Sequence, residues 1–257
     1  SGGHAADQLS GLSHQVHELQ QHAELLRYIM ECRGEMEQCD AFLHLAAVDE
    51  ALDDDIVGKL ADMYTHWARH KGFSVTLVHE ELFSPKVTRQ IILLLEGVSV
   101  YGILQGEEGI HEFIHGRTSK TPRYSQFAKV RVLPAVDDDI LKVSTADLEV
   151  EKHKSHGQGL RCTATHGPSL VTVAGHSDLS LARATELLTD LLRAEIYFVR
   201  FLDSGDPGER EDIRRKYTLR PNQSAKDQRT GVATKNLGDL WQGRGLDDFL
   251  YASILER

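Results

Sequence analysis

Strand-like stretches follow one another closely in the middle of the chain, and they limit this part to a fold built on a β-sheet. Three come in succession, at residues 74–79, 90–96 and 98–104, and a fourth covers residues 130–136. Each is short, rich in β-branched and aliphatic residues, and bounded by turn-forming residues, which is the pattern that predicts strands. The segment at 110–131 is basic and broken by glycine and proline. We therefore expect a strand-rich α/β block with one irregular insertion.

Helical periodicity marks four other segments. Apolar residues recur at intervals of three and four over residues 9–30, which predicts one long amphipathic helix. The acidic run 49–55 leads into a second helix, residues 56–67, because acidic side chains favour a helix start. A third helix is expected over residues 181–201, and a closing helical segment over residues 237–255.

A second group of short strands is expected in residues 148–173, directly before the third helix. Strands followed by one covering helix form a compact unit that can stand as a small domain. The glycine- and proline-containing stretch 203–211 is the clearest linker in the chain, and residues 216–219 beyond it resemble a further strand.

The bulk composition narrows the class of protein. With 40% hydrophobic and 26% charged residues in 257, the chain is expected to fold as an ordinary globular protein. The longest apolar runs, such as residues 91–95, are far too short to cross a bilayer, so no membrane association is expected. No signal segment opens the chain, and Ser1 in place of methionine is consistent with a removed tag, transit peptide or leader. Three cysteines without a CxxC pair favour reduced thiols in a cytosol, stroma or matrix: Cys32, Cys39 and Cys162.

Two patterns resemble metal sites but have commoner explanations. His14 and His17 have a helical spacing that suits a metal ion, yet no third ligand is evident. The acidic run 49–55 contains ligands suited to a divalent cation, but solvated acidic residues at a helix start are far commoner. We therefore predict no metal site and no cofactor.

Two local basic runs stand out against a net charge of −10, which excludes a protein that simply coats nucleic acid. The first run, residues 116–131, contains no acid and interleaves cations with Tyr124 and Phe127, a combination suited to phosphate contact and base stacking. The residues predicted to contact RNA there are Arg117, Lys120, Arg123, Tyr124, Lys129 and Arg131. The second run comprises Arg214, Arg215, Lys216 and Arg220. Either run is also compatible with a solvated face on an acidic protein.

Four motifs occur in order along the chain. The first two are Met63, Tyr64, Trp67, Ala68, Gly72 and Phe73, and then Tyr101, Gly102, Leu104, Glu107, Gly109 and His111. The third comprises Val132, Leu133, Pro134, Val136 and Asp137–Asp139. The fourth comprises Arg215, Tyr217, Lys226, Asp227, Arg229–Val232, Thr234, Asp247, Phe249, Ala252 and Ser253. Together they resemble bacterial-type class I peptide chain release factors, and type 2 most closely, over residues 33–257.

The resemblance implies an α+β fold with an N-terminal helix, a central α/β superdomain and a small inserted domain of one β-sheet and a helix. Residues 1–33 would be an N-terminal helical remnant. Residues 34–149 and 205–257 would form the superdomain, which reads the stop codon in the family. Residues 150–204 would be the counterpart of the catalytic domain, which carries a Gly-Gly-Gln loop into the peptidyl-transferase centre.

The functional elements of the family are missing or degraded. The stretch 154–161 replaces the Gly-Gly-Gln loop, is shorter by about ten residues, and keeps only Gly157 and Gln158 as a remnant. The stretch 115–124 contains no Ser-Pro-Phe tripeptide, which type 2 factors use for the stop codon, and residues 47–50 replace a glycine-rich turn. The resemblance therefore implies a degenerate paralogue without catalytic residues, and we predict that the chain is not an enzyme.

The expected function is thus a non-catalytic, release-factor-like protein that binds the ribosome or a specific RNA, as the plastid paralogue lacking Gly-Gly-Gln does in stabilising a transcript. An organelle is the expected location, either the chloroplast stroma or the mitochondrial matrix, with the bacterial cytoplasm as the alternative. Two other interpretations remain open. One is a scaffold subunit of a larger organellar assembly, with other protein subunits docked through the N-terminal helix. The other is an active peptidyl-tRNA hydrolase that uses Gln158.

Overall fold

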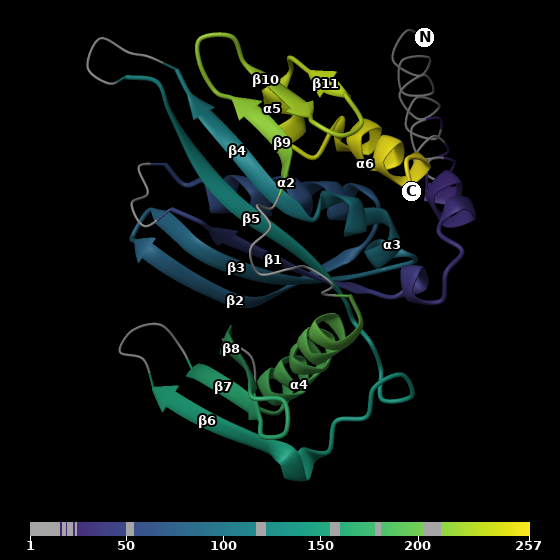
Figure 1. The fold of residues 1–257 in the computed structure, drawn as a ribbon, viewed down its shortest axis with the longest axis vertical. Coiled ribbons are helices and arrows are strands. Elements are labelled where there is room, and N and C mark those ends of the chain that lie inside the picture. The colour runs from purple at the N-terminus through teal and green to yellow at the C-terminus, as the bar shows by residue number, and fades with distance from the viewer. Residues whose placement is uncertain are drawn as a thin grey trace, which may run out of the picture.

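The computed structural model contains two units of unequal size, each built on its own β-sheet (Figure 1). In the described residues, the larger unit has an eight-stranded sheet and the smaller a three-stranded sheet. The residues that the structure describes are Val16, Leu19, Ala23 and the ranges 25–49, 54–116, 122–154, 160–177, 181–202 and 212–257.

The chain builds most of the large unit, then the small unit, and then returns to finish the large one. The first group is η1 Met36–Gln38, β1 Ala41–Ala47, α2 Ile56–His70, β2 Ser74–Ser84, β3 Val87–Glu96, α3 Val100–Leu104, η2 Gln105–Glu107, β4 Gly109–His115 and β5 Tyr124–Pro134. The small unit follows with η3 Thr145–Asp147, β6 Leu148–Lys154, β7 Leu160–His166, β8 Val171–Ser177, α4 Leu181–Tyr197 and the π-helical turn η4 Phe198–Leu202. The last group is β9 Ile213–Thr218, β10 Ser224–Asp227, β11 Ala233–Thr234, α5 Leu237–Trp241 and α6 Leu246–Leu255.

The strand order of the large sheet brings distant parts of the chain together. The order is β11-β10-β9-β4-β5-β1-β3-β2, and all neighbours are antiparallel except β4 and β9, which are parallel. Because β9 follows the small unit in the chain, this parallel pair joins the segments on either side of that unit.

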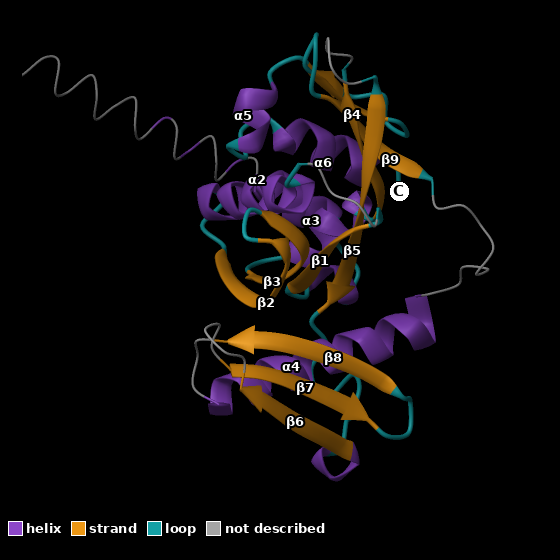
Figure 2. Ribbon diagram, turned by 90° about the vertical axis from the view of Figure 1, so that its left-hand side faces the viewer, coloured by secondary structure: helices purple, strands orange, loops and turns teal. Residues whose placement is uncertain are grey.

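Both faces of the large sheet are covered at β1 and β3, by different parts of the chain. Along β1, Ala41, Leu43 and Leu45 enter the core beneath α2, α3, α5 and α6, whereas Phe42 enters a second core on the opposite face. Successive strand residues point to opposite faces, so a strand buried on both sides needs apolar residues at both sets of positions. Figure 2 shows α2 on one side of β1, β2 and β3 and the small unit on the other.

Helix α2 is fixed by its cap and its apolar stripe. The side chain of Asp55 accepts hydrogen bonds from the N–H of Gly58 at 2.9 Å and the N–H of Thr88 at 3.1 Å, so it caps the helix and ties it to β3. The fully buried stripe comprises Ile56, Leu60, Met63, Tyr64 and Trp67. Gly72, with φ of 77°, follows the end of the helix in the left-handed region that glycine tolerates best. The helix predicted over residues 56–67 is confirmed.

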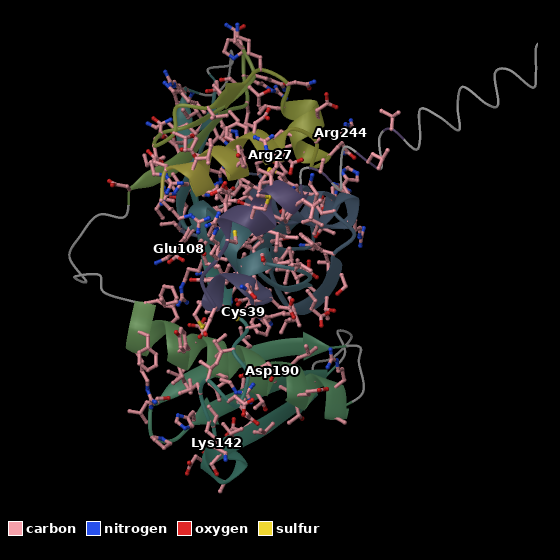
Figure 3. All side chains as sticks on the ribbon, turned by 90° about the vertical axis from the view of Figure 1, so that its right-hand side faces the viewer. Arg27, Cys39, Glu108, Lys142, Asp190 and Arg244 are labelled. Carbon is pink, nitrogen blue, oxygen red and sulfur yellow. The ribbon has the colours of Figure 1, made fainter. Side chains whose placement is uncertain are left out.

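The small unit packs its helix and its sheet together against the face of the large sheet that lies opposite α2. We call this the outer face. Its three strands are ordered β6-β7-β8, and the apolar face of α4 is buried against them. The shared core includes Leu188 and Leu191 of α4 together with Phe42, Leu94 and Leu133 of the large sheet. In Figure 3, Asp190 and Lys142 lie in this lower unit, whereas Cys39 and Glu108 lie in the upper one.

The strand predicted over residues 98–104 is wrong. The chain turns at Ser99, whose φ of 58° is left-handed, and then forms the short helix α3. All five residues of α3 are buried, so the segment carries no amphipathic periodicity. A short apolar run of this kind cannot be told apart from a buried strand by its pattern.

The irregular insertion predicted over residues 110–131 is largely a regular hairpin. Strands β4 and β5 pair from Gly109 with Val130 to His115 with Tyr124. The closing segment is two helices instead of one, because the chain turns at Gly243 and Gly245, both of which have positive φ. Of the long N-terminal helix, Val16, Leu19, Ala23 and residues 25–31 are described, and they are helical.

The predicted α+β fold class, with an N-terminal helix, a central superdomain and a small inserted unit, is confirmed. The chain passes from one sheet to the other between Pro134 and Leu148, and returns between Ser177 and Ile213. The domain boundaries predicted at residues 33, 149 and 204 stay predictions.

Candidate nucleic-acid interface

One end of each basic run, Arg123 of the first and Arg220 of the second, lies at the same end of the large sheet. In the parallel pair of β4 and β9, Ile114 is in register with Thr218, and the N–H of Leu219 donates to the carbonyl of Ile114 at 2.9 Å. Gly116 is packed tightly against the residues that follow β9: a Cβ on Gly116 would lie 2.6 Å from the carbonyl carbon of Arg220. Arg220 therefore flanks the base of the hairpin tip.

The predicted RNA-contact residues divide between this end and other places. Arg117 and Lys120 lie outside the described residues. Arg123 is exposed directly before β5, and Lys129 is half-buried within it. Tyr124 stacks face to face on the ring of His115, with the centroids 4.4 Å apart and the planes 1° from parallel.

Arg131 joins the two units. Its guanidinium makes a two-pronged ion pair with the carboxylate of Glu195 on α4, at 3.0 and 2.9 Å, and lies 4.7 Å from the ring centroid of Phe198. Planar pairing of this kind is among the stronger charged contacts in proteins. The structure therefore places Arg131 in the contact between the units and not on the basic surface.

Arg215, in the middle of the second basic run, is not on the surface either. Its side chain is fully buried, and its Nη2 lies 2.5 Å from Oε1 of Glu107 and 3.7 Å from Oδ2 of Asp227. The ring of Phe249 on α6 covers the guanidinium at 4.2 Å from its centroid, and the hydroxyl of Tyr64 donates to Oε2 of Glu107 at 2.8 Å. Buried charges require this degree of pairing.

This buried cluster also fixes the protonation of its members. Burial alone would lower the pKa of Arg215, but Glu107, Tyr217, Tyr64 and Asp227 together outweigh burial and raise that pKa. Burial, reinforced by the positive charge of Arg215, lowers the pKa of His111 to about 4. The neutral ring of His111 then bonds the hydroxyl of Tyr217 at 3.2 Å and the carbonyl of Glu107 at 3.0 Å.

Asp227 shapes the turn that carries Arg229–Val232 of the fourth motif. Its carboxylate accepts from the N–H of Arg229 at 3.0 Å and of Thr230 at 2.9 Å, and Gly231 follows with φ of 75°. An aspartate that bonds the backbone two and three residues on, followed by a left-handed glycine, defines a tight turn. Asp227 and residues 229–231 of the motif therefore shape this turn.

The stretch that replaces the Gly-Gly-Gln loop of the family connects two paired strands of the small unit. Strands β6 and β7 stay paired up to Lys154 with Leu160, so the connection is residues 155–159. The remnant residues Gly157 and Gln158 lie outside the described residues.

The acidic residues that suggested a cation site have structural partners. Asp49 accepts from the N–H of Phe127 at 2.6 Å, Asp54 pairs with Lys59 at 2.5 Å, and Asp55 is the cap of α2. In the described ranges, no group of three His, Cys, Asp or Glu side chains is placed to hold a metal ion, and His14 and His17 lie outside those ranges. None of the helices in the described part of the chain is both long and apolar enough to cross a membrane.

Lys226 belongs to the fourth motif, but the sequence did not predict it as an RNA-contact residue. It stands outside both basic runs, but β10 places it in register with Lys216 on β9. Only the pairing of β9 with β10 brings the two ammonium groups together, so no local pattern in the sequence indicates it.

A mixed sheet completed by C-terminal strands, with a sheet-and-helix unit inserted before them, defines the fold class of the peptide chain release factors. RF2 of Thermus thermophilus has this fold: it superposes with a TM-score of 0.77 and 22% identity, over 96% of this chain and 76% of that one. The PCRF domain family matches residues 4–124. This match begins well before residue 33, where the resemblance was expected to begin. The chain is thus similar to peptide chain release factors in sequence and has their fold.

Its relatives include proteins named peptide chain release factor 2. The one from Phenylobacterium zucineum is 27% identical, over 95% of this chain and 72% of its own length. The one from Listeria monocytogenes is 28% identical over 77% of this chain, and the one from Ruegeria is 29% identical over 86%. The chain spans 60% and 64% of the length of these last two relatives.

Proposed function

We propose that this release-factor relative binds RNA, within the ribosome or as a transcript, and does not hydrolyse peptidyl-tRNA. The observation that carries the proposal is the meeting of one end of each basic run at one end of the sheet, where the exposed Arg123 and Arg220 flank the base of the β4–β5 hairpin tip. A net charge of −10 repels a polyanion from the molecule as a whole, so productive contact requires such a local concentration of cations.

The short connection between β6 and β7 supports the absence of hydrolysis. Ester hydrolysis at a peptidyl-tRNA needs a positioned water and donors aimed at the developing oxyanion. Residues 155–159, even fully extended out and back, reach only ~9 Å beyond the paired strand ends, at about 3.5 Å per residue. A hydrolytic tip on so short a connection stays close to the body of the small unit.

The test of RNA binding compares the wild type with the double variant Arg123→Ala, Arg220→Ala. Fluorescence anisotropy with a mixed-sequence RNA oligonucleotide, at several salt concentrations, is expected to give a weaker affinity for the variant. The slope of log affinity against log salt is expected to fall by about two, one for each lost phosphate contact. The matched control is Arg69→Ala, Arg89→Ala, which removes two exposed arginines from elsewhere on the large unit. Equal loss in both double variants would contradict the proposal, as would no RNA binding by the wild type.

The test of hydrolysis measures peptide release from stalled ribosomes. We expect no release by the wild type, and sedimentation with purified ribosomes distinguishes ribosomal RNA from a free transcript as the partner. Release that Gln158→Ala abolishes would instead establish an active hydrolase.

An organellar location belongs to the same proposal. It is supported by Cys32, Cys39 and Cys162, which are free thiols, as expected in a reducing matrix or stroma. The relatives named above come from bacteria, so the bacterial cytoplasm is the alternative. Fractionation of the source cells, followed by immunodetection of the protein, separates the two.

A scaffold role is the second candidate, and one observation favours it. Along the N-terminal helix, Val16, Leu19, Leu26 and Met30 are between 53% and 67% exposed and share one stripe. A helix of another subunit is the partner that such a stripe would fit. If Leu19→Glu, Leu26→Glu releases the native protein from a defined complex without changing RNA affinity, the scaffold role is preferred.

A further inference from the structure

The outer face of the large sheet is divided into two halves of opposite character. Under the small unit, β1, β3 and β5 present apolar residues such as Phe42, Leu94 and Leu133. Beyond it, the same face presents polar and charged side chains on β5, β9 and β10, and on β4 it presents Glu112 between Ile110 and the buried Ile114. Helices α2, α5 and α6 lie on the opposite side of these strands, as Figures 1 and 2 show. A polar half-face on a sheet otherwise buried on both sides is built to meet water or a polar partner.

One row of side chains crosses all four strands of this half-face. Glu112 on β4 is in register with Phe127 on β5 and with Lys216 on β9, and Lys216 is in register with Lys226 on β10. At the 4.7–4.9 Å spacing of neighbouring strands, the row is ~14 Å long from Phe127 to Lys226. That length matches about four stacked nucleotides at 3.4 Å each.

The rows on either side of this one also contain polar side chains. On one side lie the hydroxyls of Ser125, Thr218 and Ser224, with the buried Ile114 between the first two, and on the other side Lys129 lies beside Ile110. Register therefore places three ammonium groups on this half-face, on three different strands.

The carboxylate in the row offsets one of these three charges. Glu112 accepts from the hydroxyl of Ser125 at 2.7 Å and pairs with Lys216 at 3.1 Å, so it orients that lysine. Lys226 is exposed at the end of the row, and Phe127 is half-buried at the other end. The row thus combines an aromatic ring with cations on a flat surface, which are the components that bind unpaired nucleic acid.

We infer that single-stranded RNA lies across β5, β4, β9 and β10, with a base against Phe127 and phosphates at Lys216 and Lys226. The inference rests on the proposed RNA-binding function and names the form of RNA and the surface that holds it. A duplex keeps its bases stacked inside and would offer only its phosphates to this surface, so Phe127 would contribute little to binding it.

The experiment measures the affinities of two probes for full-length variants: a 12-nucleotide single-stranded RNA and a duplex of the same length. Lys226→Glu is expected to weaken single-strand binding about tenfold, and Phe127→Leu about fivefold, as loss of one base–aromatic contact predicts. Lys86→Glu, in the turn between β2 and β3, is the matched charge reversal at a distant exposed lysine, and is expected to change little. Thermal melting of Phe127→Leu verifies that the sheet is intact.

The outcomes separate the inference from the proposed function. If the wild type binds and Arg123→Ala, Arg220→Ala weakens binding, but Lys226→Glu and Phe127→Leu behave like Lys86→Glu, the function stands and this surface is excluded. If Phe127→Leu weakens duplex and single-strand binding equally, the preference for a single strand is overturned. If the wild type binds neither probe, the proposed function falls and this inference falls with it.

Discussion

Arg215 and Glu107 form a fully buried ion pair, with Nη2 and Oε1 2.5 Å apart, between β9 and the turn before β4. The two residues are separated by the whole small unit in sequence, so the pair links the two halves of the large unit. A buried pair contributes little relative to a well-packed apolar substitute, because both charges lose their hydration. Removing one partner is strongly destabilising, because the other charge then stays buried without a counter-charge.

We therefore predict that Arg215→Ala lowers the free energy of unfolding by about 3–5 kcal/mol, because Glu107 and Asp227 lose the buried cation between them. Urea unfolding followed by circular dichroism measures the change. The exposed Arg69→Ala is the control, and we expect its change to stay within about 0.5 kcal/mol. A loss below about 1 kcal/mol in Arg215→Ala would show that the two carboxylates need no cation.

Arg131 and Glu195 should set the strength of the contact between the units. Their side chains are 21% and 13% exposed, so solvent screens the pair only partly. A double-mutant cycle with Arg131→Ala and Glu195→Ala is expected to give a coupling energy of about 1–2 kcal/mol, between the values for exposed and buried pairs. Hydrogen exchange at the amides of α4 should accelerate in each single variant, whereas exchange in α2 should not change. A coupling energy near zero would show that this pair does not hold the units together.

The pH dependence of stability should reflect two histidines that burial keeps neutral, His44 and His111. Burial lowers the pKa of His44 and of His111 to about 4, and Arg131 adds to the effect at His44. An unfolded histidine titrates near 6.5. Between pH 6.5 and 4 the unfolded chain therefore binds more protons, so this contribution to stability is complete above pH 6.5 and is lost as the pH falls.

Each of these histidines should lower the free energy of unfolding by up to about 1.4 kcal/mol per pH unit below pH 6.5. Denaturant unfolding at pH 7.5, 6.0 and 5.0 measures the slope before most carboxylates titrate. His44→Gln, which cannot be protonated, should remove about one proton from that slope. An unchanged slope in this variant would mean that His44 binds its proton over the same pH range in the folded protein as in the unfolded chain.

Gly102, part of the second motif, is required by close packing. A Cβ at this position would lie 2.6 Å from the carbonyl oxygen of Glu37 and 2.8 Å from the sulfur of Cys32. Gly102→Ala is expected to lower the free energy of unfolding by about 1–3 kcal/mol, the usual effect of overpacking. Gly238→Ala in α5 is the control, because its Cβ would meet only Asn236 at 3.6 Å. Equal melting temperatures for the two variants would contradict this explanation of the motif.

Local signals in the sequence predicted those elements that are determined locally. Helix α2 was found because Asp55 caps it and its apolar residues recur at helical spacing. Helix α3 was missed because all its residues are buried, and the left-handed turn at Ser99 has no sequence signature as clear as a glycine. The four motifs, taken together, predicted the fold class through family resemblance where periodicity alone could not.

The candidate site was harder to predict because partners far apart in sequence decide which cations are exposed. Arg131 and Arg215 both stand in basic runs, yet Glu195 binds one and Glu107 the other. Conversely, Lys226 has an ordinary sequence context, and only sheet register places it beside Lys216. Sequence pattern identifies basic residues, but their partners in the folded chain determine which of them are exposed to solvent.

The small unit supplies one wall of the second core, and this has an evolutionary consequence. Without it, Phe42, Leu94 and Leu133 would face water on a broad apolar surface prone to self-association. A descendant that discarded the unit would first have to make β1, β3 and β5 amphipathic, several substitutions at once. Selection for solubility alone can thus preserve the inserted segment after any chemistry at its tip has gone.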